Sequence, residues 1–233
     1  MSAVPERCLD CLVRDTALCS AMEDQELVAL SAIGRRKIYP GGQVVTWSGD
    51  PNSFCANIVT GVLKVTASTP DGREQIVGLL HPGDFVGEPF AEEAPLTITA
   101  VSDTDLCLFP RESFQRTMDE HPRMEKLLLR RTMASLTQAQ QRLLALGRRN
   151  AGEKIAGFLI DLCDRMAPDA EGPVEIDLPI SRGEMADYLG LTIETVSRQL
   201  TGLRRDGVVS FEKGNRHFRV LDRARLEHLA DPE

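Results

Sequence analysis

Short apolar runs separated by turn residues fill much of the first half of the chain, from about residue 38 to residue 109. Glycine, proline and aspartate interrupt the runs at Tyr39–Gly42, Ser48–Asp50, Pro70–Gly72 and His81–Asp84. Turn signals at intervals of roughly 8 to 12 residues are typical of a small β-roll or barrel. The pattern predicts six strands, namely Gln43–Trp47, Ala56–Val59, Val62–Thr66, Gln75–Leu80, Thr97–Val101 and Asp105–Phe109.

After this region the apolar positions repeat with the period of a helix. Pro122 suits a first helical position, and helix-forming residues continue to Leu146, a length of about 37 Å at 1.5 Å per residue. One face has a three-four spacing that suits packing against a second copy of the same helix. This predicted dimerisation seam consists of Leu129, Thr132, Leu136, Ala139, Leu143 and Leu146. Because Thr132 interrupts the apolar series, packing on the β-roll is an alternative, and different faces of the helix allow both.

Residues 180–209 have the pattern of two short helices joined by a tight turn. Ser181 and Glu184 form a capping-box start, and Gly190 is placed to end the first helix in the left-handed conformation. Thr192 is placed to cap the second helix. The predicted buried stripe of that helix is Ile193, Val196, Leu200 and Leu203. Together with a following hairpin, this order predicts a winged helix-turn-helix, whose second helix enters the DNA major groove.

The exposed face of the second helix has side chains suited to reading base edges. Glu194, Ser197 and Arg198 share this face, because residues three and four positions apart are neighbours on a helix. Arginine can bond guanine, glutamate can accept from cytosine N4, and serine can hydrogen-bond a base or touch a thymine methyl. Thr192 and Thr195 lie at the same end and complete the predicted DNA-binding residues of this helix. An ordinary charged helix face is the alternative.

The hairpin is predicted to have strands Val208–Glu212 and His217–Val220, with Lys213 and Arg216 of its turn holding DNA phosphate. The segment 196–225 contains eight Lys and Arg against three Asp and Glu, whereas the whole chain has a formal net charge of -8. Overall acidity argues against general nucleic-acid binding, but the local basic excess lies where double-stranded DNA is expected to bind.

Length and composition indicate a globular chain with two domains, since it has 233 residues of which 42% are hydrophobic. The expected divisions are a cysteine-rich arm at 1–22, a β-roll at 23–121, a dimerisation helix at 122–147 and a DNA-binding domain at 148–233. No apolar run reaches the ~18 residues of a membrane span, and the N-terminus lacks the pattern of a secretory signal. A cytoplasmic protein without membrane association is therefore expected.

The six cysteines are unevenly distributed. Cys8, Cys11 and Cys19 form a C-x2-C-x7-C motif, whereas Cys55, Cys107 and Cys163 stand alone in apolar surroundings. In a reducing compartment, closely spaced cysteines indicate ligands of a soft metal rather than disulfides. Three ligands are one short, because structural zinc and iron–sulfur clusters both usually take four. The spacing by itself leaves both zinc and iron–sulfur open.

The order of cysteine trio, β-roll, long helix and winged helix-turn-helix resembles the CRP/FNR superfamily of bacterial transcription regulators. The segment from Glu194 to Arg198 resembles the E-x-x-S-R of its FNR subgroup, the oxygen-responsive regulators that carry a [4Fe–4S] cluster. This resemblance covers nearly the whole chain. It implies an α+β fold and a fourth ligand at Cys107, in the segment Asp105–Pro110, while Cys55 and Cys163 have no counterpart and are interpreted as buried.

The resemblance also implies a mechanism. Four thiolates on a [4Fe–4S] cluster would hold the arm against the β-roll and favour a homodimer, with two recognition helices about one DNA turn apart. Loss of the cluster in oxygen would weaken the dimer and its binding to a TTGAT-type palindrome. RNA polymerase is the implied partner, with a contact surface near Gly87–Phe90.

Two alternatives to an iron–sulfur regulator differ in what the protein binds. A cyclic-nucleotide receptor would pair the ligand phosphate with an arginine, but the segment Pro95–Ala100 that follows Gly87 and Glu88 has none, so cyclic-nucleotide binding is not expected. The other alternative is a zinc-stabilised or cluster-free regulator that does not respond to oxygen. An enzyme is not expected, because the sequence shows no nucleophile-base pair and no phosphate loop.

Overall fold

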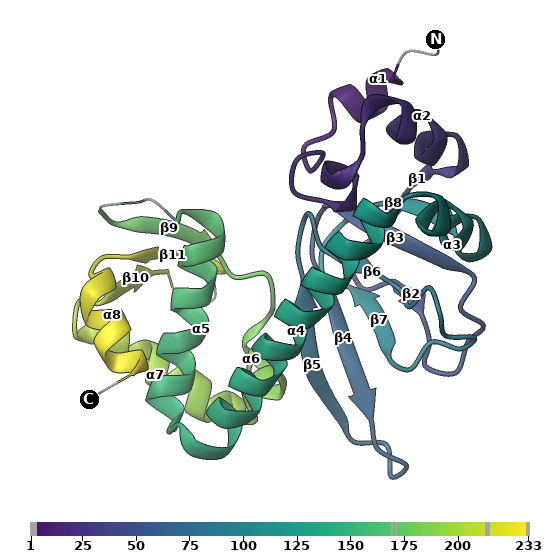
Figure 1. The fold of residues 1–233 in the computed structure, drawn as a ribbon. Coiled ribbons are helices and arrows are strands. Elements are labelled where there is room, and N and C mark those ends of the chain that lie inside the picture. The colour runs from purple at the N-terminus through teal and green to yellow at the C-terminus, as the bar shows by residue number, and fades with distance from the viewer. Residues whose placement is uncertain (1–3, 169, 171, 213–214, 232–233) are drawn as a thin grey trace. The chain divides into compact units, whose positions relative to one another are not determined.

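The computed structural model describes residues 4–168, 170, 172–212 and 215–231, and the chain forms two compact units, Met1–Thr137 and Gln138–Glu233 (Figure 1). The first unit begins with three short helical segments. These are α1 (Glu6–Leu9), the 3-10 helix η1 (Leu18–Ala21) and α2 (Asp24–Ile33). A capping box between Glu23 and Glu26 starts α2, since each side chain accepts from the backbone N–H of the other residue.

The predicted β-roll is present as two four-stranded antiparallel sheets (Figure 1). One sheet has the order β1 (Arg35–Tyr39), β8 (Thr104–Pro110), β3 (Phe54–Thr60), β6 (Phe85–Val86); the other has β2 (Val44–Thr46), β7 (Thr97–Ala100), β4 (Leu63–Ser68), β5 (Glu74–Leu80). Side chains of both sheets form one core, in which Ile58, Leu63 and Leu106 are fully buried.

All six predicted strands are confirmed, but the sequence prediction missed β1 and β6. Strand β1 lies at the edge of its sheet and begins with Arg35, Arg36 and Lys37, and its first four positions are exposed. It therefore lacks the apolar alternation by which a half-buried strand is recognised. Strand β6 has only two residues, which is too short to show any period.

The helix predicted to start at Pro122 is α4 (Pro122–Arg148), which follows α3 (Arg111–Glu120). Its first turn packs on the β-roll unit, because Met124 is fully buried in a cluster with Phe109 and Phe114. Beyond that turn, apolar side chains more than half exposed extend along the helix. These are Leu129, Met133, Leu136, Leu143 and Leu144. The helix thus combines packing on the β-roll at its start with an apolar face that the described residues leave exposed.

The second unit contains the predicted winged helix-turn-helix. Its elements are α5 (Ala151–Met166), β9 (Val174–Asp177), α6 (Arg182–Leu189), α7 (Ile193–Arg205), β10 (Val209–Phe211), β11 (His217–Val220) and α8 (Arg223–Ala230). The predicted hairpin β10–β11 is confirmed, and β9 adds a third strand beside β11 that the sequence prediction missed. Because β9 has only four residues, its alternation is too brief to be decisive.

The expected helix ends are confirmed. The Ser181 hydroxyl accepts from Glu184 N–H at 3.2 Å, and the Glu184 carboxylate accepts from Ser181 N–H at 2.9 Å. Gly190 ends α6 with a positive φ of 62°. Thr192 caps α7 by accepting from the backbone N–H of Thr195 at 3.2 Å.

The prediction that Ile193 belongs to the buried stripe of α7 is wrong. Val196 and Leu200 of α7 are fully buried and Leu203 is half-buried, but Ile193 is 54% exposed. Ile193 lies in the first turn of α7 and faces Gly183 of α6, where a Cβ would come 3.6 Å from its Cδ1. Because glycine has no side chain to cover it, Ile193 stays at the surface.

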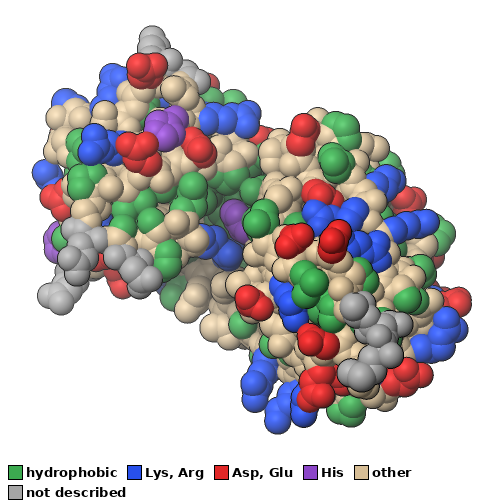
Figure 2. Space-filling model, turned by 90° about the horizontal axis from the view of Figure 1, so that it is seen from above, with side chains coloured by type: hydrophobic (Ala, Val, Ile, Leu, Met, Phe, Trp, Pro, Cys, Tyr) green, Lys and Arg blue, Asp and Glu red, His purple; other side chains and the backbone are tan. Residues whose placement is uncertain are grey.

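Acidic and basic side chains are interspersed over the face of the molecule in Figure 2, with hydrophobic side chains between them. Within the described residues, the helices are too short or too polar to cross a membrane.

Candidate functional site

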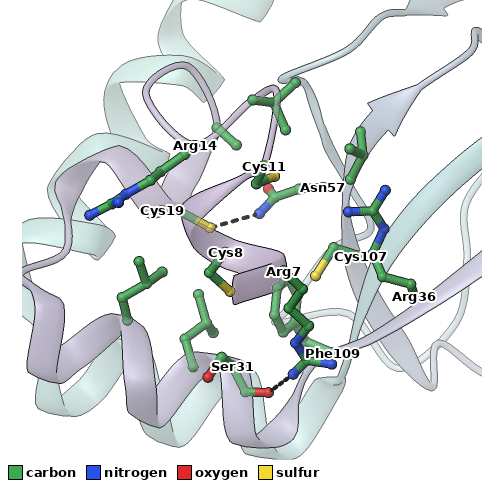
Figure 3. Close-up of a pocket in the computed structure, with 15 residues that line it drawn as sticks. Arg7, Cys8, Cys11, Arg14, Cys19, Ser31, Arg36, Asn57, Cys107 and Phe109 are labelled. Atoms are coloured by element: carbon green, nitrogen blue, oxygen red, sulfur yellow. Dashed lines mark hydrogen bonds between the residues drawn. The ribbon is translucent and has the colours of Figure 1, made fainter. Parts of the chain in front are cut away.

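The structure brings together the cysteine trio predicted from its spacing and Cys107, the fourth ligand that the family resemblance implied. Cys8 lies in α1, Cys11 in the turn that follows, Cys19 in η1 and Cys107 in β8, and all four line one cavity. Figure 3 shows the three arm thiols and the Cys107 thiol around this cavity. The arm therefore folds back over the β-roll, as a shared site for all four thiols requires.

The strand register explains why Cys107 faces the cavity. Leu106 and Leu108 point into the core of the β-roll, so Cys107 between them must point to the opposite face of the sheet. Its register partners are Arg36 on β1 and Asn57 on β3, and both of these side chains also line the cavity. Three neighbouring strands thus supply a thiol, a guanidinium and an amide to one wall.

The remaining walls are mainly apolar, formed by side chains such as Leu27, Leu30 and Val59. Two of the arginines that line the cavity are fixed by other partners. Arg36 forms a bidentate ion pair with Asp105, with Nε 2.8 Å from Oδ1. Arg7 donates to the backbone carbonyls of Ser31 and Gly34, the latter at 3.0 Å.

A second arginine contact joins the arm to α4. Arg131 donates from Nη1 to the Gly83 carbonyl at 2.7 Å and from Nη2 to the Thr16 carbonyl. Thr16 lies between Cys11 and Cys19, and Gly83 lies in the turn between β5 and β6. One guanidinium of the predicted dimerisation helix therefore contacts both the cysteine arm and the β-roll.

Burial makes the Cys19 and Cys107 thiols hard to ionise without a bound cation. The pKa of Cys19 is raised to about 12, first by burial and then by the neighbouring Cys107, Cys11 and Cys8. Burial likewise raises the pKa of Cys107 to about 11, although the positive charge of Arg36 acts in the opposite direction. A bound metal centre would offset both effects, because a coordinating thiol is deprotonated by the positive charge of the metal.

The arrangement of the thiols bears on which metal centre fits. Among the described residues, no group of three or more His, Cys, Asp or Glu side chains is placed to hold a single metal ion. Thiolates that bind zinc must converge to about 2.3 Å from one point. The four thiols here instead surround a cavity, which suits a larger group with one cysteine for each iron. Four thiols around one cavity are the donor set that a [4Fe–4S] cluster takes, so these residues fit that group.

The other two cysteines lie elsewhere, as their sequence context predicted. Cys55 is fully buried on β3 in the cluster with Phe109 and Phe114, and Cys163 is fully buried on α5 in the second unit. Neither lines the cavity. Both behave as small core side chains, so they serve as internal controls for substitution of the four cavity cysteines.

In the second unit, the predicted base-reading side chains lie on the open face of α7. Glu194 and Arg198 are exposed, and Ser197 is half-buried. The Thr192 and Thr195 hydroxyls bond each other at 3.1 Å, and Arg198 Nη2 donates to the Thr195 hydroxyl at 3.4 Å. The arginine is thus held along the helix near its N-terminal end.

In the wing beside α7, two arginines contact a pair of stacked aromatic rings. Phe211 of β10 stacks on Phe218 of β11 with ring centroids 4.2 Å apart, and the guanidinium groups of Arg182 and Arg204 lie over Phe211. Arg216 is exposed just before β11, whereas Lys213 lies outside the described residues. The sequence analysis did not single out Arg182 and Arg204, because only the fold brings them to the same ring.

Comparison with known proteins identifies the family. The Cyclic nucleotide-binding domain family matches residues 36–121, and the Crp-like helix-turn-helix domain family matches residues 153–229. The Transcriptional activator protein FnrL of Cereibacter sphaeroides is 45% identical over 224 residues, which cover 94% of this chain and 90% of FnrL. The chain belongs to the CRP/FNR family of transcription regulators.

Further CRP/FNR relatives agree with this assignment. The Nitrogen fixation regulation protein FixK of Bradyrhizobium diazoefficiens is 36% identical, over 96% of this chain and 93% of FixK. The solved structure of FixK2 from Bradyrhizobium japonicum matches with a TM-score of 0.78 and 31% identity, covering 86% of this chain and 99% of that one. Membership of this family confirms the predicted DNA-binding regulator and the prediction that the chain is not an enzyme.

Proposed function

We propose that this CRP/FNR regulator responds to oxygen and that Cys8, Cys11, Cys19 and Cys107 hold a [4Fe–4S] cluster. The observation that carries the proposal is the placement of these four thiols around one cavity between the arm and the β-roll. When bound, the cluster would supply an oxygen-labile centre and tie the arm to β8. Every other part of the proposed mechanism is performed by side chains of the chain itself.

The arm transmits the state of the cavity to α4. Val13, Ala17 and Leu18 are buried, so the loop between Cys11 and Cys19 packs against the β-roll unit when its cysteines are held. In this position the Thr16 carbonyl accepts a hydrogen bond from Arg131 of α4. Release of the cysteines would free the loop, and Arg131 would lose this partner.

The homodimer is proposed to form through the exposed apolar face of α4. Leu129, Leu136 and Leu143 of the predicted seam are each more than half exposed. Thr132 and Ala139 are exposed as well, whereas Leu146 is half-buried. Met133 and Leu144 widen the seam beyond the sequence prediction. A second copy would cover these side chains and place two α7 helices about one DNA turn apart.

Each α7 is proposed to read one half of a TTGAT-type palindrome through Glu194, Ser197 and Arg198, with phosphate contacts from the wing. A bound dimer would activate or block transcription through its position beside RNA polymerase, and the name of FnrL supports activation. The segment Gly87–Phe90 is the proposed polymerase contact, and Phe90 in it is 72% exposed. Binding of a cyclic nucleotide is not part of the proposal.

The first test is anaerobic purification of the chain with iron, sulfide and zinc analysis. We expect brown protein with four irons and four sulfides per chain, and thiolate-to-iron absorption that fades in air. Colourless protein with stoichiometric zinc would favour the zinc-stabilised alternative and overturn the proposal.

A serine series identifies the ligands. Each single replacement by serine should strongly lower the amount of bound iron, because a serine hydroxyl is a poor substitute for a thiolate. The positions are Cys8, Cys11, Cys19 and Cys107. The matched controls are Cys55→Ser and Cys163→Ser, which remove buried cysteines outside the cavity and should leave the iron content unchanged. Normal iron in Cys107→Ser together with loss in Cys55→Ser would move the fourth ligand to Cys55.

A further inference from the structure

A buried amide lies against one of the four cavity thiols. Asn57 on β3 is only 2% exposed, and its Nδ2 donates to Cys19 Sγ over 3.6 Å (Figure 3). On the same side chain, Oδ1 is buried without a hydrogen-bond partner in the described part of the chain. Asn57 lines the cysteine cavity, whose walls include the apolar side chains of Leu27, Leu30 and Val59.

A polar side chain with an unsatisfied atom is unfavourable in such surroundings, because it loses its hydrogen bonds to water. An amide is thus less stable here than an apolar side chain of the same size, unless the cavity contains a group that it binds. The donor end of the amide points at sulfur. An anionic sulfur is a stronger acceptor than a neutral thiol, so this orientation suits a thiolate at Cys19.

The strand register fixes the amide in place. Asn57 pairs with Cys107 on β8 and with Phe85 on β6, so it lies between two strands of a sheet rather than on a loop. Its side chain therefore reaches Cys19 of the arm from the wall that also holds Cys107. This rigid placement allows the amide to discriminate between states of the sulfur that differ in charge.

We propose that Asn57 is a positioning residue for the proposed cluster, and that its amide N–H stabilises the Cys19 thiolate bound to it. The inference rests on the proposed function. Hydrogen bonds to ligand sulfurs favour the electron-rich state of an iron–sulfur cluster and raise its reduction potential. Asn57 therefore makes the cluster harder to oxidise and sets how readily it is lost in air.

The test compares Asn57→Leu, which keeps the approximate size and removes the donor, with the wild-type chain. In anaerobically loaded protein, we expect a more negative reduction potential and a roughly tenfold faster fading of the thiolate-to-iron absorption in air. Asn57→Ser keeps a donor, so its reduction potential and its rate of fading should lie between those of Asn57→Leu and the wild type. The matched control is Thr66→Val, which removes a buried polar group of β4 outside the cavity and should leave both readouts unchanged.

Unchanged potential and fading in a folded, iron-loaded Asn57→Leu variant would overturn the inference, and so would an equal change in Thr66→Val. If Asn57→Leu does not fold, Asn57→Ser decides, because its potential must still shift in the negative direction. A wild-type chain without iron and sulfide would overturn the proposed function and this inference with it. If the wild type binds iron and sulfide but the Asn57 variants have the same potential and fading rate, the inference is overturned and the proposed function is not.

Discussion

Single residues at the two sites act through the partners that hold them. Arg198 is exposed, yet its guanidinium bonds the Thr195 hydroxyl, which in turn bonds the Thr192 cap. These two linked hydrogen bonds limit the conformations of the Arg198 side chain before DNA binds. Less conformational entropy is therefore lost on binding. Arg216 in the wing is also exposed, but it belongs to the predicted phosphate contacts. The two arginines should therefore contribute differently to specificity.

Arg198→Ala should weaken binding to a TTGAT-type site by about 1–3 kcal/mol and weaken binding to random DNA much less, because a base contact carries sequence information. Arg216→Ala serves as the comparison. It should weaken binding to all sequences alike. It should also reduce the slope of log K against log salt concentration by about one unit. The measurement is fluorescence anisotropy with matched and scrambled duplexes, and equal losses for Arg198→Ala on both duplexes would contradict base reading.

At the scale of elements, α4 has two different regions along its length. Its first turn is anchored by Met124 in the cluster with Phe109 and Phe114, and its middle presents the apolar face with Leu129 and Leu136. Arg131 lies between these two regions and donates to the arm and to the turn between β5 and β6. The state of the arm can thus influence the helix at the position where the proposed dimer contact begins.

Arg131→Ala should uncouple the cluster from dimerisation. We expect iron binding to be normal, because Arg131 contacts the backbone of the arm through Thr16 rather than a cysteine. Loss of charge-assisted hydrogen bonds should weaken the loaded dimer about tenfold. Arg130→Ala is the control, since it removes the same charge from an exposed neighbouring position. Analytical ultracentrifugation of the loaded proteins measures the effect, and equal dimerisation of the two variants would rule out this coupling.

At the scale of the whole molecule, positive charge is concentrated in one segment although the net charge is negative. The chain has a formal net charge of -8, but residues 126–152 contain six Lys and Arg and no Asp or Glu. Three of these cations have partners in their own unit. Arg131 bonds two carbonyls, Arg142 lies 4.6 Å from the Tyr188 ring centroid, and Arg149 lies 3.7 Å from Asp231. Asp231 offsets the charge of Arg149, which lies just beyond the end of α4. The carbonyl and ring partners of Arg131 and Arg142 leave their positive charges in place, so two copies of α4 are still expected to repel.

Dimerisation of the cluster-free chain should therefore become tighter as salt rises. Screening over the Debye length of ~8 Å at physiological salt weakens repulsion between parallel basic helices. Sedimentation equilibrium of cluster-free protein in increasing potassium chloride measures the association constant. A constant or falling value would show that the basic side chains of α4, such as Lys126 and Arg130, do not oppose the dimer.

The sequence by itself determined the features that depend on neighbours along the chain. The capping box of Ser181, the left-handed Gly190 and the Thr192 cap were readable because their hydrogen bonds span only a few residues. The long helix from Pro122 was readable from its helical period, and six strands were readable from apolar runs bounded by turn residues. These elements also carried the family resemblance that the comparisons confirm.

Only the tertiary structure decided what surrounds the cysteine cavity. Asn57 and Arg36 reach it because β3 and β1 pair with β8 on both sides of Cys107, and such long-range pairing leaves no local signal in the sequence. Edge strand β1 was missed because its polar residues lack an alternating pattern, and the exposure of Ile193 depends on a glycine in another helix. The family resemblance named Cys107 as a ligand, and only the folded chain brings its thiol to the same cavity as the arm.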